Sequence, residues 1–275
     1  MFRLVASNEF GKSIDFTNNK LFNIVNVDGL NQTKSVFTEN TIPVYPGSFL
    51  NSSRLEKRNI VLTVLLESYD DTSRKLLNST FITNKNIDLR VNNFYNISGL
   101  VESVEYNLFI NKITAQISII CFDPFFTTDR IDYVMSDVEN LLEFPYSATD
   151  YGRSMGNITF EFFADLNNQG HVPTGCIFDV KFKGSVVNLI LENYTYNQEM
   201  YIYGSFVNGD HLIIDTRIGA KSIKLNNSNY INNLRIDSEW IELEPGINHV
   251  TYDVFNGYYT NVEITCSLYN KVGGI

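Results

Sequence analysis

The sequence predicts a mainly β protein made of two β-sandwich-like domains, the first of which also packs one α-helix. Composition is the first indication, because 20 of the 275 residues are Phe and 16 are Tyr, and both favour strands. The second is pattern, since apolar and polar residues alternate in short runs, as half-buried strands require. The third is that turn-forming residues separate these runs, which is typical of sandwich architecture.

Five stretches show the alternation most clearly. They are 59–68 (NIVLTVLLES), 113–122 (ITAQISIICF), 156–165 (GNITFEFFAD), 178–184 (FDVKFKG) and 259–269 (YTNVEITCSLY). Turns are predicted where Gly, Pro, Asn and Asp cluster, because these residues adopt a positive φ or end strand pairing. The predicted turns are Val27–Gly29, Tyr45–Gly47, Asn208–Asp210 and Glu244–Gly246.

Two helices interrupt the strands. The first covers residues 70–81, where two leading aspartates suit the positive end of the helix dipole and Leu76 and Leu77 give an inward face. The second covers residues 136–144, where Ser136 and a Glu three residues later have the spacing of a capping box.

A polar, turn-rich stretch follows the second helix at residues 145–157 and indicates a domain boundary. We therefore expect an N-terminal β domain at residues 1–132, with its helix near 70–81. A helical connector is expected at 133–152, and a second β-sandwich domain at 153–275.

The charge balance excludes two classes of partner. The chain has 21 Lys and Arg against 31 Asp and Glu, a net charge of -10. A surface this acidic repels phosphate backbones, so we expect no sequence-specific nucleic-acid binding. No apolar run approaches the roughly 20 residues that span a bilayer, and the first residues lack the pattern of a signal peptide. Membrane insertion is not expected either.

The three cysteines, Cys121, Cys176 and Cys266, are far apart and lack CxxC spacing. An odd, scattered set is typical neither of a disulfide framework nor of a zinc site. Each cysteine lies in an apolar or strand-like run, so we predict buried free thiols and folding in a reducing cytosol.

Residues 209–223 (GDHLIIDTRIGAKSI) concentrate groups that could do chemistry, either as a metal or catalytic site or as the polar residues of a hairpin. In a hairpin, 211–216 and 221–226 form the strands, and alternation places His211 and Asp215 on one face. Four residues along a strand span roughly 13 Å. Both side chains cannot then ligate one ion, because metal–ligand bonds are near ~2 Å. The hairpin is the favoured interpretation.

The rest of the sequence also lacks catalytic motifs. None of the three histidines lies in a recognisable motif, and a zincin helix, a GxSxG elbow, a P-loop and a GxGxxG after a strand are all absent. Glu242 and Glu244 flank a turn on one face of a strand, as solvated carboxylates do. We predict that the chain is not an enzyme and has no catalytic, metal-binding or cofactor-binding residues; a hydrolase serves only as a control hypothesis.

A carbohydrate-binding module is a stronger alternative, because apolar sugar faces stack on exposed aromatic rings. The candidate contacts are Trp240, Tyr201 and Tyr203. Strict alternation turns Trp240 outward, whereas a break at Ser238–Glu239 would shift the phase and place it in the core. Cross-strand packing explains the two tyrosines equally well. The core interpretation of these aromatic residues is favoured over the binding one.

The order of motifs resembles the distal tail proteins (Dit) of siphophages and related prophage particles. Segments that carry the resemblance are 21–30 (LFNIVNVDGL), 45–47, 58–68, 70–81, 95–107, 117–126 (ISIICFDPFF), 172–180, 209–223, 237–254 and the terminal GGI. The most specific part is GD-x-L-x-IDT followed by W-x-x-L-x-PG-x-N.

The resemblance implies a structural virion protein located at the tail tip or baseplate and synthesised in the bacterial host cytoplasm. It implies an N-terminal domain that forms a homo-hexameric ring and a galectin-like or carbohydrate-module-like C-terminal sandwich. The implied partners are the tail tube protein, the tail-associated lysin or tip protein, and receptor-binding proteins or a cell-surface glycan. The alternative function is a carbohydrate-binding β-sandwich protein for host cell-wall attachment.

Overall fold

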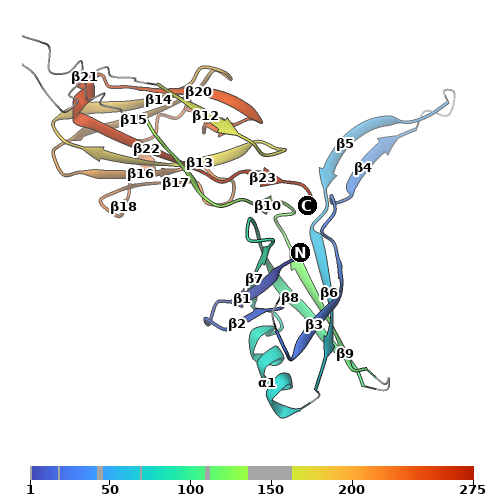
Figure 1. Ribbon diagram of the computed structural model, residues 1–275. Coiled ribbons are helices and arrows are strands. Elements are labelled where there is room, and N and C mark those ends of the chain that lie inside the picture. Colours follow the sequence, from blue (N-terminus) through green and yellow to red (C-terminus); the bar gives the residue numbers. More distant parts are fainter. Residues whose placement is uncertain (1, 18, 42–45, 69, 109–111, 136–162) are drawn as a thin grey trace, which may run out of the picture. The chain divides into compact units, whose positions relative to one another are not determined.

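The computed structural model describes residues 2–17, 19–41, 46–68, 70–108, 112–135 and 163–275. These residues are mainly β, as predicted, and divide into two compact units (Figure 1). Unit 1 consists of Met1–Asp129 together with Lys271–Ile275, and unit 2 of Arg130–Asn270. The division falls three residues before the predicted boundary at 132, and the last five residues return to unit 1. They return because Lys271–Val272 pairs with Phe126–Thr127 in an antiparallel bridge.

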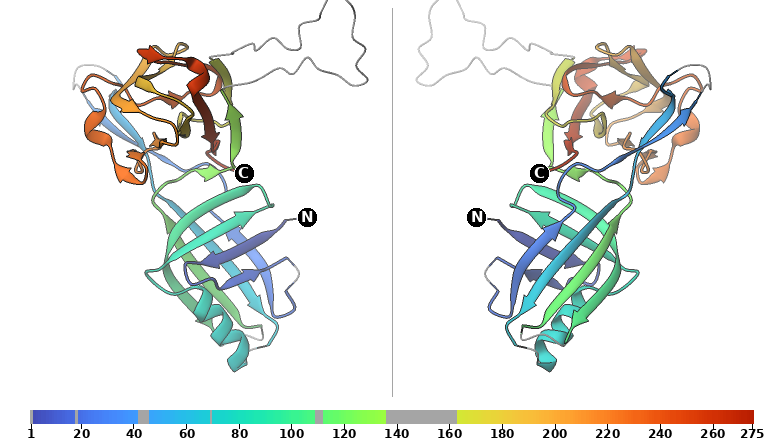
Figure 2. Two further views of the ribbon diagram at one scale, coloured as in Figure 1. Left: turned by 90° about the vertical axis from the view of Figure 1, so that its left-hand side faces the viewer. Right: turned by 90° about the vertical axis from the view of Figure 1, so that its right-hand side faces the viewer.

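Unit 1 is built on one large sheet with the path β2-β1-β7-β8-β9-β6-β3, and β10 and β23 extend it beside β8. Its strands are β1 (Leu4–Asn8), β2 (Ser13–Asp15), β3 (Phe22–Asp28), β6 (Arg58–Leu66), β7 (Asn86–Val91), β8 (Tyr95–Asn107), β9 (Thr114–Cys121), β10 (Phe126–Thr127) and β23 (Lys271–Val272). Strands from both ends of this path contribute to one apolar core, so the sheet curls over itself (Figure 2).

The only α-helix in the described residues, α1 (Asp71–Thr80), begins one residue after the predicted start. Asp70 is its N-cap and accepts a hydrogen bond from Ser73 N at 2.7 Å. The side-chain hydrogen bond from Ser73 lowers the pKa of Asp70 below its ordinary value. Leu77 is fully buried and joins the core of unit 1, which confirms the predicted inward face.

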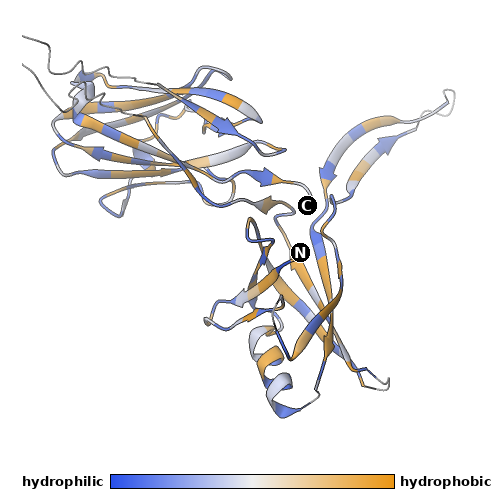
Figure 3. Cartoon of the chain, viewed as in Figure 1, coloured by the Kyte–Doolittle hydropathy of each residue, from blue (hydrophilic) through white to orange (hydrophobic). Residues whose placement is uncertain are grey.

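A separate two-stranded hairpin, β4 (Ser35–Asn40) and β5 (Phe49–Leu55), belongs to unit 1 but pairs with no other described strand. Residues Leu30–Lys34 lead into it, and Arg58 begins β6 directly after it. All residues of β5 are exposed, and bands of apolar residues lie along both strands (Figure 3).

Unit 2 is a sandwich of two antiparallel sheets. One has the path β11-β22-β13-β16-β17-β18 with β19 beside β13, and the other the path β12-β20-β14-β15 with β21 beside β14. Their strands are β11 (Ile131–Val134), β12 (Phe163–Asn168), β13 (Thr174–Phe182), β14 (Val186–Asn193), β15 (Gln198–Phe206), β16 (His211–Asp215), β17 (Ser222–Leu225), β18 (Ser228–Asn229), β19 (Glu242–Leu243), β20 (Gly246–Asp253), β21 (Asn256–Gly257) and β22 (Val262–Leu268). Short 3₁₀ turns occupy η1 (Ile231–Asn233) and η2 (Tyr259–Asn261).

Alternate side chains of both sheets fill one core between them, where Phe182 stacks on Phe206 with 4.3 Å between ring centroids. The galectin-like or carbohydrate-module-like character of this sandwich stays a prediction. The predicted helix at 136–144 and the first part of the predicted strand at 156–165 lie outside the described residues. Most of the predicted connector at 133–152 lies there too, while Tyr133 and Val134 belong to β11.

Candidate functional site

The stretch 209–223 forms the predicted hairpin of β16 and β17, paired from Leu212↔Leu225 to Asp215↔Ser222. Leu212 and Ile214 are buried on one face, and His211 and Ile213 are half-buried on the other, as the alternation predicts. The Nε2 of His211 lies 2.9 Å from a carboxylate oxygen of Asp179 on neighbouring β13. The His211 side chain is thus paired with a carboxylate of the neighbouring strand in the same sheet, as in the hairpin interpretation.

Two residues of the IDT motif fix the end of this hairpin. Thr216 is fully buried; its hydroxyl accepts a hydrogen bond from Cys176 N at 2.9 Å and donates one to Cys176 O at 3.1 Å. Asp215 accepts two hydrogen bonds from the Arg217 guanidinium, at 2.9 and 2.7 Å. These hydrogen bonds raise the pKa of Arg217 above its ordinary value. Thr216 therefore holds the end of β16 against β13, and Asp215 fixes the residues that directly follow β16.

The PG-x-N motif has the same kind of role. Asn248 is fully buried; its amide donates to Glu244 O at 2.8 Å and Gly246 O at 3.1 Å, and its carbonyl oxygen accepts from Glu244 N at 3.1 Å. Gly246 has φ +106°, which favours glycine. The asparagine thus holds the tight turn before β20 from inside the sandwich.

Buried thiols and acidic groups in the described residues do not assemble into a metal site. No group of three or more His, Cys, Asp or Glu in this part of the chain is placed to hold an ion. The three cysteines are free and buried, as predicted. Burial raises the pKa of the Cys121 thiol to about 11 and that of Cys266 well above its ordinary value, so both stay protonated at neutral pH.

Tyr201 and Tyr203 lie together on the outer face of β15, with 4.8 Å between ring centroids. The Tyr201 hydroxyl accepts a hydrogen bond from Asn188 at 2.9 Å, and the Arg235 guanidinium lies 4.9 Å from the Tyr201 ring centroid. Tyr203 keeps 47% of its surface exposed. The pair is therefore a fixed aromatic surface with an exposed ring.

Trp240 follows the strict alternation, since Ile241 and Leu243 point into the core and Trp240 does not. The Trp240 ring is nevertheless half-buried and packs against the core of unit 2, so both the core and the carbohydrate-contact interpretations of this residue stay predictions. Its ring lies 5.6 Å from Lys221 Nζ. The Trp240 ring lies near Lys221, whereas the tyrosine rings contact each other and Arg235. In the described part of the chain, the three predicted residues are therefore not joined by ring contacts into one aromatic cluster.

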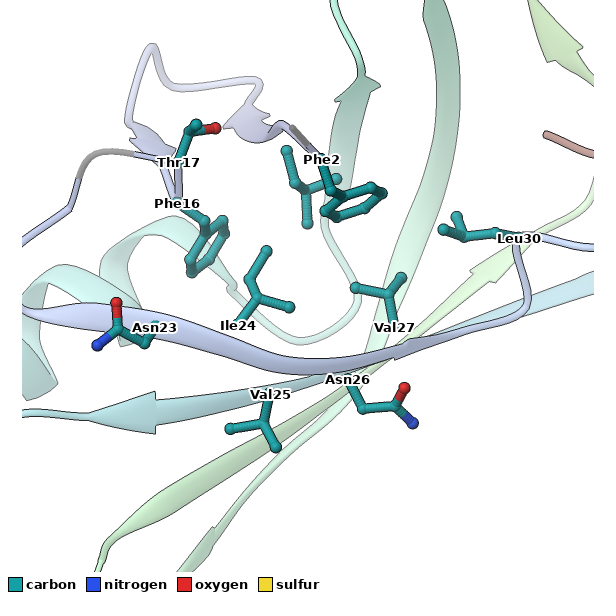
Figure 4. Close-up of a pocket in the computed structure, with 10 residues that line it drawn as sticks. Phe2, Phe16, Thr17, Asn23, Ile24, Val25, Asn26, Val27 and Leu30 are labelled. Atoms are coloured by element: carbon teal, nitrogen blue, oxygen red, sulfur yellow. The ribbon is translucent and has the colours of Figure 1, made fainter.

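Unit 1 carries two apolar surfaces. On the hairpin, three large side chains are more than half exposed: Phe37 (57%), Phe49 (57%) and Leu50 (63%). The other is a groove of about 560 Å³ beside edge strand β3. Figure 4 shows Phe2, Phe16, Ile24 and Val27 pointing into this groove, while Val25 and Asn26 point away. Exposed apolar surface of this kind is typical of protein contacts.

Arg58 was not selected from the sequence, although its pattern indicated burial. It lies in phase with the buried residues Ile60, Leu62 and Val64 of β6, and only 1% of its surface is exposed. Its guanidinium donates to backbone oxygens of Pro124 at 2.7 Å and Asn31 at 2.6 Å, and also to Gly29 and Gly273. Desolvation lowers its pKa below the ordinary value of an arginine.

Known proteins resemble this chain in both sequence and fold. Residues 169–267 match the family model for the siphovirus-type tail component, C-terminal domain. A search of curated proteins finds no match. Among solved structures, the Dit protein of phage SPP1 matches with a TM-score of 0.72 and 13% identity, over 98% of this chain and 99% of that chain. It is described as a paradigm of the hub adsorption apparatus in phages that infect Gram-positive bacteria.

Two further similar chains come from baseplates of phage p2 in the activated conformation. The calcium form matches with a TM-score of 0.54 and 9% identity over 100% of both chains. The strontium form matches with a TM-score of 0.51 and 9% identity over 98% of both chains. At such identities the structural matches establish a shared fold.

Fold and sequence together define the class, a two-unit β protein whose second unit contains the stretch that is similar to a tail-component domain. The resemblance to the Dit family is confirmed. Residues 169–267 are similar to the C-terminal domain of the siphovirus-type tail component, and the chain shares, over nearly its whole length, the fold of SPP1 Dit. None of the helices in the described residues is long and apolar enough to cross a membrane.

Proposed function

We propose that this chain is a structural hub protein of a phage or prophage-derived tail, located at the tail tip or baseplate. The observation that carries the proposal is the fold match to SPP1 Dit over 98% of this chain, which includes both units. In this role the chain works by assembly rather than catalysis. Its neighbours would be the tail tube protein on one side and the tail-associated lysin or tip protein on the other, with receptor-binding proteins anchored to it.

The proposed assembly is a ring of six copies. A ring needs two different surfaces on each subunit, because each copy meets one neighbour on each side. The hairpin β4–β5 and the groove beside β3 supply two such surfaces in unit 1. Strand β3 also has a free edge in the described sheet, since it pairs only with β6, and free edges accept further backbone contacts.

The charge of unit 1 supports a channel through which DNA passes. Strands β3, β6, β8 and β9 contain no Lys or Arg except the buried Arg58. The exposed residues of these strands include the carboxylates Asp28, Glu102 and Glu105. A channel wall made of this face would repel phosphates rather than bind them by counterion release.

The test is multi-angle light scattering of the purified chain at moderate salt. Six copies of 31.5 kDa give a ring of about 189 kDa. We expect the wild-type chain to reach this mass and a Phe37→Ser, Phe49→Ser double variant to remain smaller. The matched control is Ile236→Ser, which also removes an exposed apolar side chain but lies in unit 2.

A wild-type chain that stays at 31.5 kDa at every concentration, including mixtures with the tail tube protein, would contradict the ring. Equal loss of mass in the Ile236→Ser control would instead show that the hairpin has no special part in assembly.

A second candidate function is carbohydrate binding by the outer face of unit 2, favoured by the fixed Tyr201–Tyr203 pair. Aromatic rings with a free face stack on apolar sugar faces, and Glu199 and Asp237 near Arg235 offer acceptors for sugar hydroxyls. The test is titration of the chain with host cell-wall polysaccharide fragments. Tyr203→Ala should abolish binding without changing thermal unfolding, while Trp240→Ala tests the half-buried ring separately. Equal binding by wild type and Tyr203→Ala would refute this site.

A further inference from the structure

Residues Lys271–Ile275 pack against the segment that leads into the hairpin. The Ile275 amide donates to Leu30 O at 3.1 Å. Gly274 lies so close to this segment that a Cβ there would be 2.7 Å from Gln32 N, a distance that real Cβ atoms essentially never show. Its neighbour Gly273 has more room, since a Cβ there would meet only Gln32 Cγ at 3.8 Å. The glycine at 274, but not the one at 273, is therefore required by the contact.

The buried guanidinium of Arg58 hydrogen-bonds to the same junction between the last residues of the chain and the segment that leads into the hairpin. One fork of planar donors serves carbonyl groups from three separate segments: 29–31 before the hairpin, Pro124 after β9, and Gly273 after β23. The guanidinium also lies 4.5 Å from the Phe126 ring centroid. Lysine could not reproduce this arrangement, because its ammonium is a compact group without the fixed fork.

The hairpin begins and ends at this junction. Gln32 precedes β4 by a few residues, Arg58 follows β5, and Glu56 N donates to Lys34 O at 3.0 Å to close the base. Because β4 and β5 pair only with each other among the described strands, no ladder to another strand orients the hairpin, and the contacts at its base can do so.

We propose that Lys271–Ile275 and Arg58 form a latch that holds the base of the β4–β5 hairpin in one orientation. The chain enters the latch directly from unit 2, since Asn270 is the last residue of that unit. The consequence for ring assembly rests on the function proposed above, whereas the latch itself does not.

The test compares Gly274→Ala with Gly273→Ala in the full chain. Trypsin can cut after three exposed basic residues at the hairpin base, Lys34, Arg54 and Lys57. We expect Gly274→Ala to speed cleavage at these sites about tenfold, because the added methyl displaces the latch and opens the base locally. Gly273→Ala should be cut at the wild-type rate. Equal rates in the two variants overturn the proposal.

A second variant and a measurement on the unmodified chain cover the case in which Gly274→Ala does not fold. Arg58→Lys should also speed cleavage at the base while leaving amide exchange in β13 of unit 2 unchanged. In the wild-type chain, the amides of Glu56 and Ile275 should exchange with deuterium at protection factors within about threefold of each other, as one opening unit does. A difference of about a hundredfold or more would overturn the latch.

The mass measurement separates the two proposals. If the wild-type chain forms no ring but Gly274→Ala is cut faster, the latch stands and the ring fails. If the ring forms and the glycine variants behave alike, the ring stands and the latch fails.

Discussion

The interior of unit 2 and the hairpin of unit 1 depart from the usual distribution of residues in opposite ways. Unit 2 buries polar side chains, of which Thr216 and Asn248 are the clearest cases. The hairpin exposes apolar ones, of which Phe49 and Leu50 are examples. Every buried polar atom named above has partners in neighbouring backbone, so it contributes to folding. The exposed side chains of Phe49 and Leu50 keep more than half of their surface accessible, so they are available for the association proposed for this chain.

This difference teaches how to interpret the motifs shared with tail components. A motif residue that is polar and buried fixes a turn or a strand end, and its loss lowers the stability of one unit. An exposed apolar residue should leave stability unchanged and alter the mass of the assembly. The two classes of substitution can be separated because the sole tryptophan, Trp240, lies in unit 2 and its fluorescence reports the unfolding of that unit.

The largest effect is expected for Arg58→Met. Four part-buried hydrogen bonds from the buried guanidinium to carbonyl groups would be lost at once, which should lower the stability of unit 1 by about 3–5 kcal/mol. Urea unfolding followed by circular dichroism should show an earlier transition, while the Trp240 fluorescence midpoint stays in place. Arg54→Met, in the exposed hairpin, is the control and should match the wild type. An unchanged urea transition for Arg58→Met would contradict the contrast between buried polar and exposed apolar side chains. It would mean that this buried polar group contributes nothing to the stability of unit 1.

Asn248→Ala should follow, with a loss of about 2–3 kcal/mol in unit 2, because the turn before β20 loses both donors and an acceptor. The Trp240 fluorescence midpoint should move to lower urea. Asn256→Ala, which removes an exposed amide in the same unit, serves as the control. A shift of equal size in the control would remove the special role of the motif asparagine.

Thr216→Val should cost about 1–2 kcal/mol, since the side chain keeps its shape but leaves Cys176 N and O without a side-chain partner. The same fluorescence transition measures it. Full stability in this variant would mean that the IDT motif acts through Asp215 alone.

The smallest change in stability is expected for the Phe37→Ser, Phe49→Ser variant. Both rings are already exposed in the single chain, so the unfolding free energy should stay within about 0.5 kcal/mol of the wild type. The ring mass should nevertheless fall. A large loss of stability in the isolated chain would show that these rings pack within it, and would overturn the contrast.

Local patterns predicted the elements that depend on neighbours in sequence. The α1 helix follows from its aspartate cap and paired leucines, and the β16–β17 hairpin from its alternation and Gly turns. Arg58 lies in phase with the buried residues of β6, but its four acceptors come from residues 29, 31, 124 and 273. No local pattern reveals such a set. The return of the last five residues to unit 1 could not be predicted for the same reason, because β10 pairs with β23, whose residues lie more than a hundred positions later.

The β10–β23 pair has a consequence for the architecture of the gene product. Unit 2 is an insertion into unit 1, entered after Asp129 and left before Lys271, and the two crossing points are held side by side by Phe126↔Val272. Insertions whose ends lie close together can be exchanged without breaking the host domain. Unit 2 therefore has the topology of a replaceable cassette, because its exchange would leave the β10–β23 pair and the sheet of unit 1 in place.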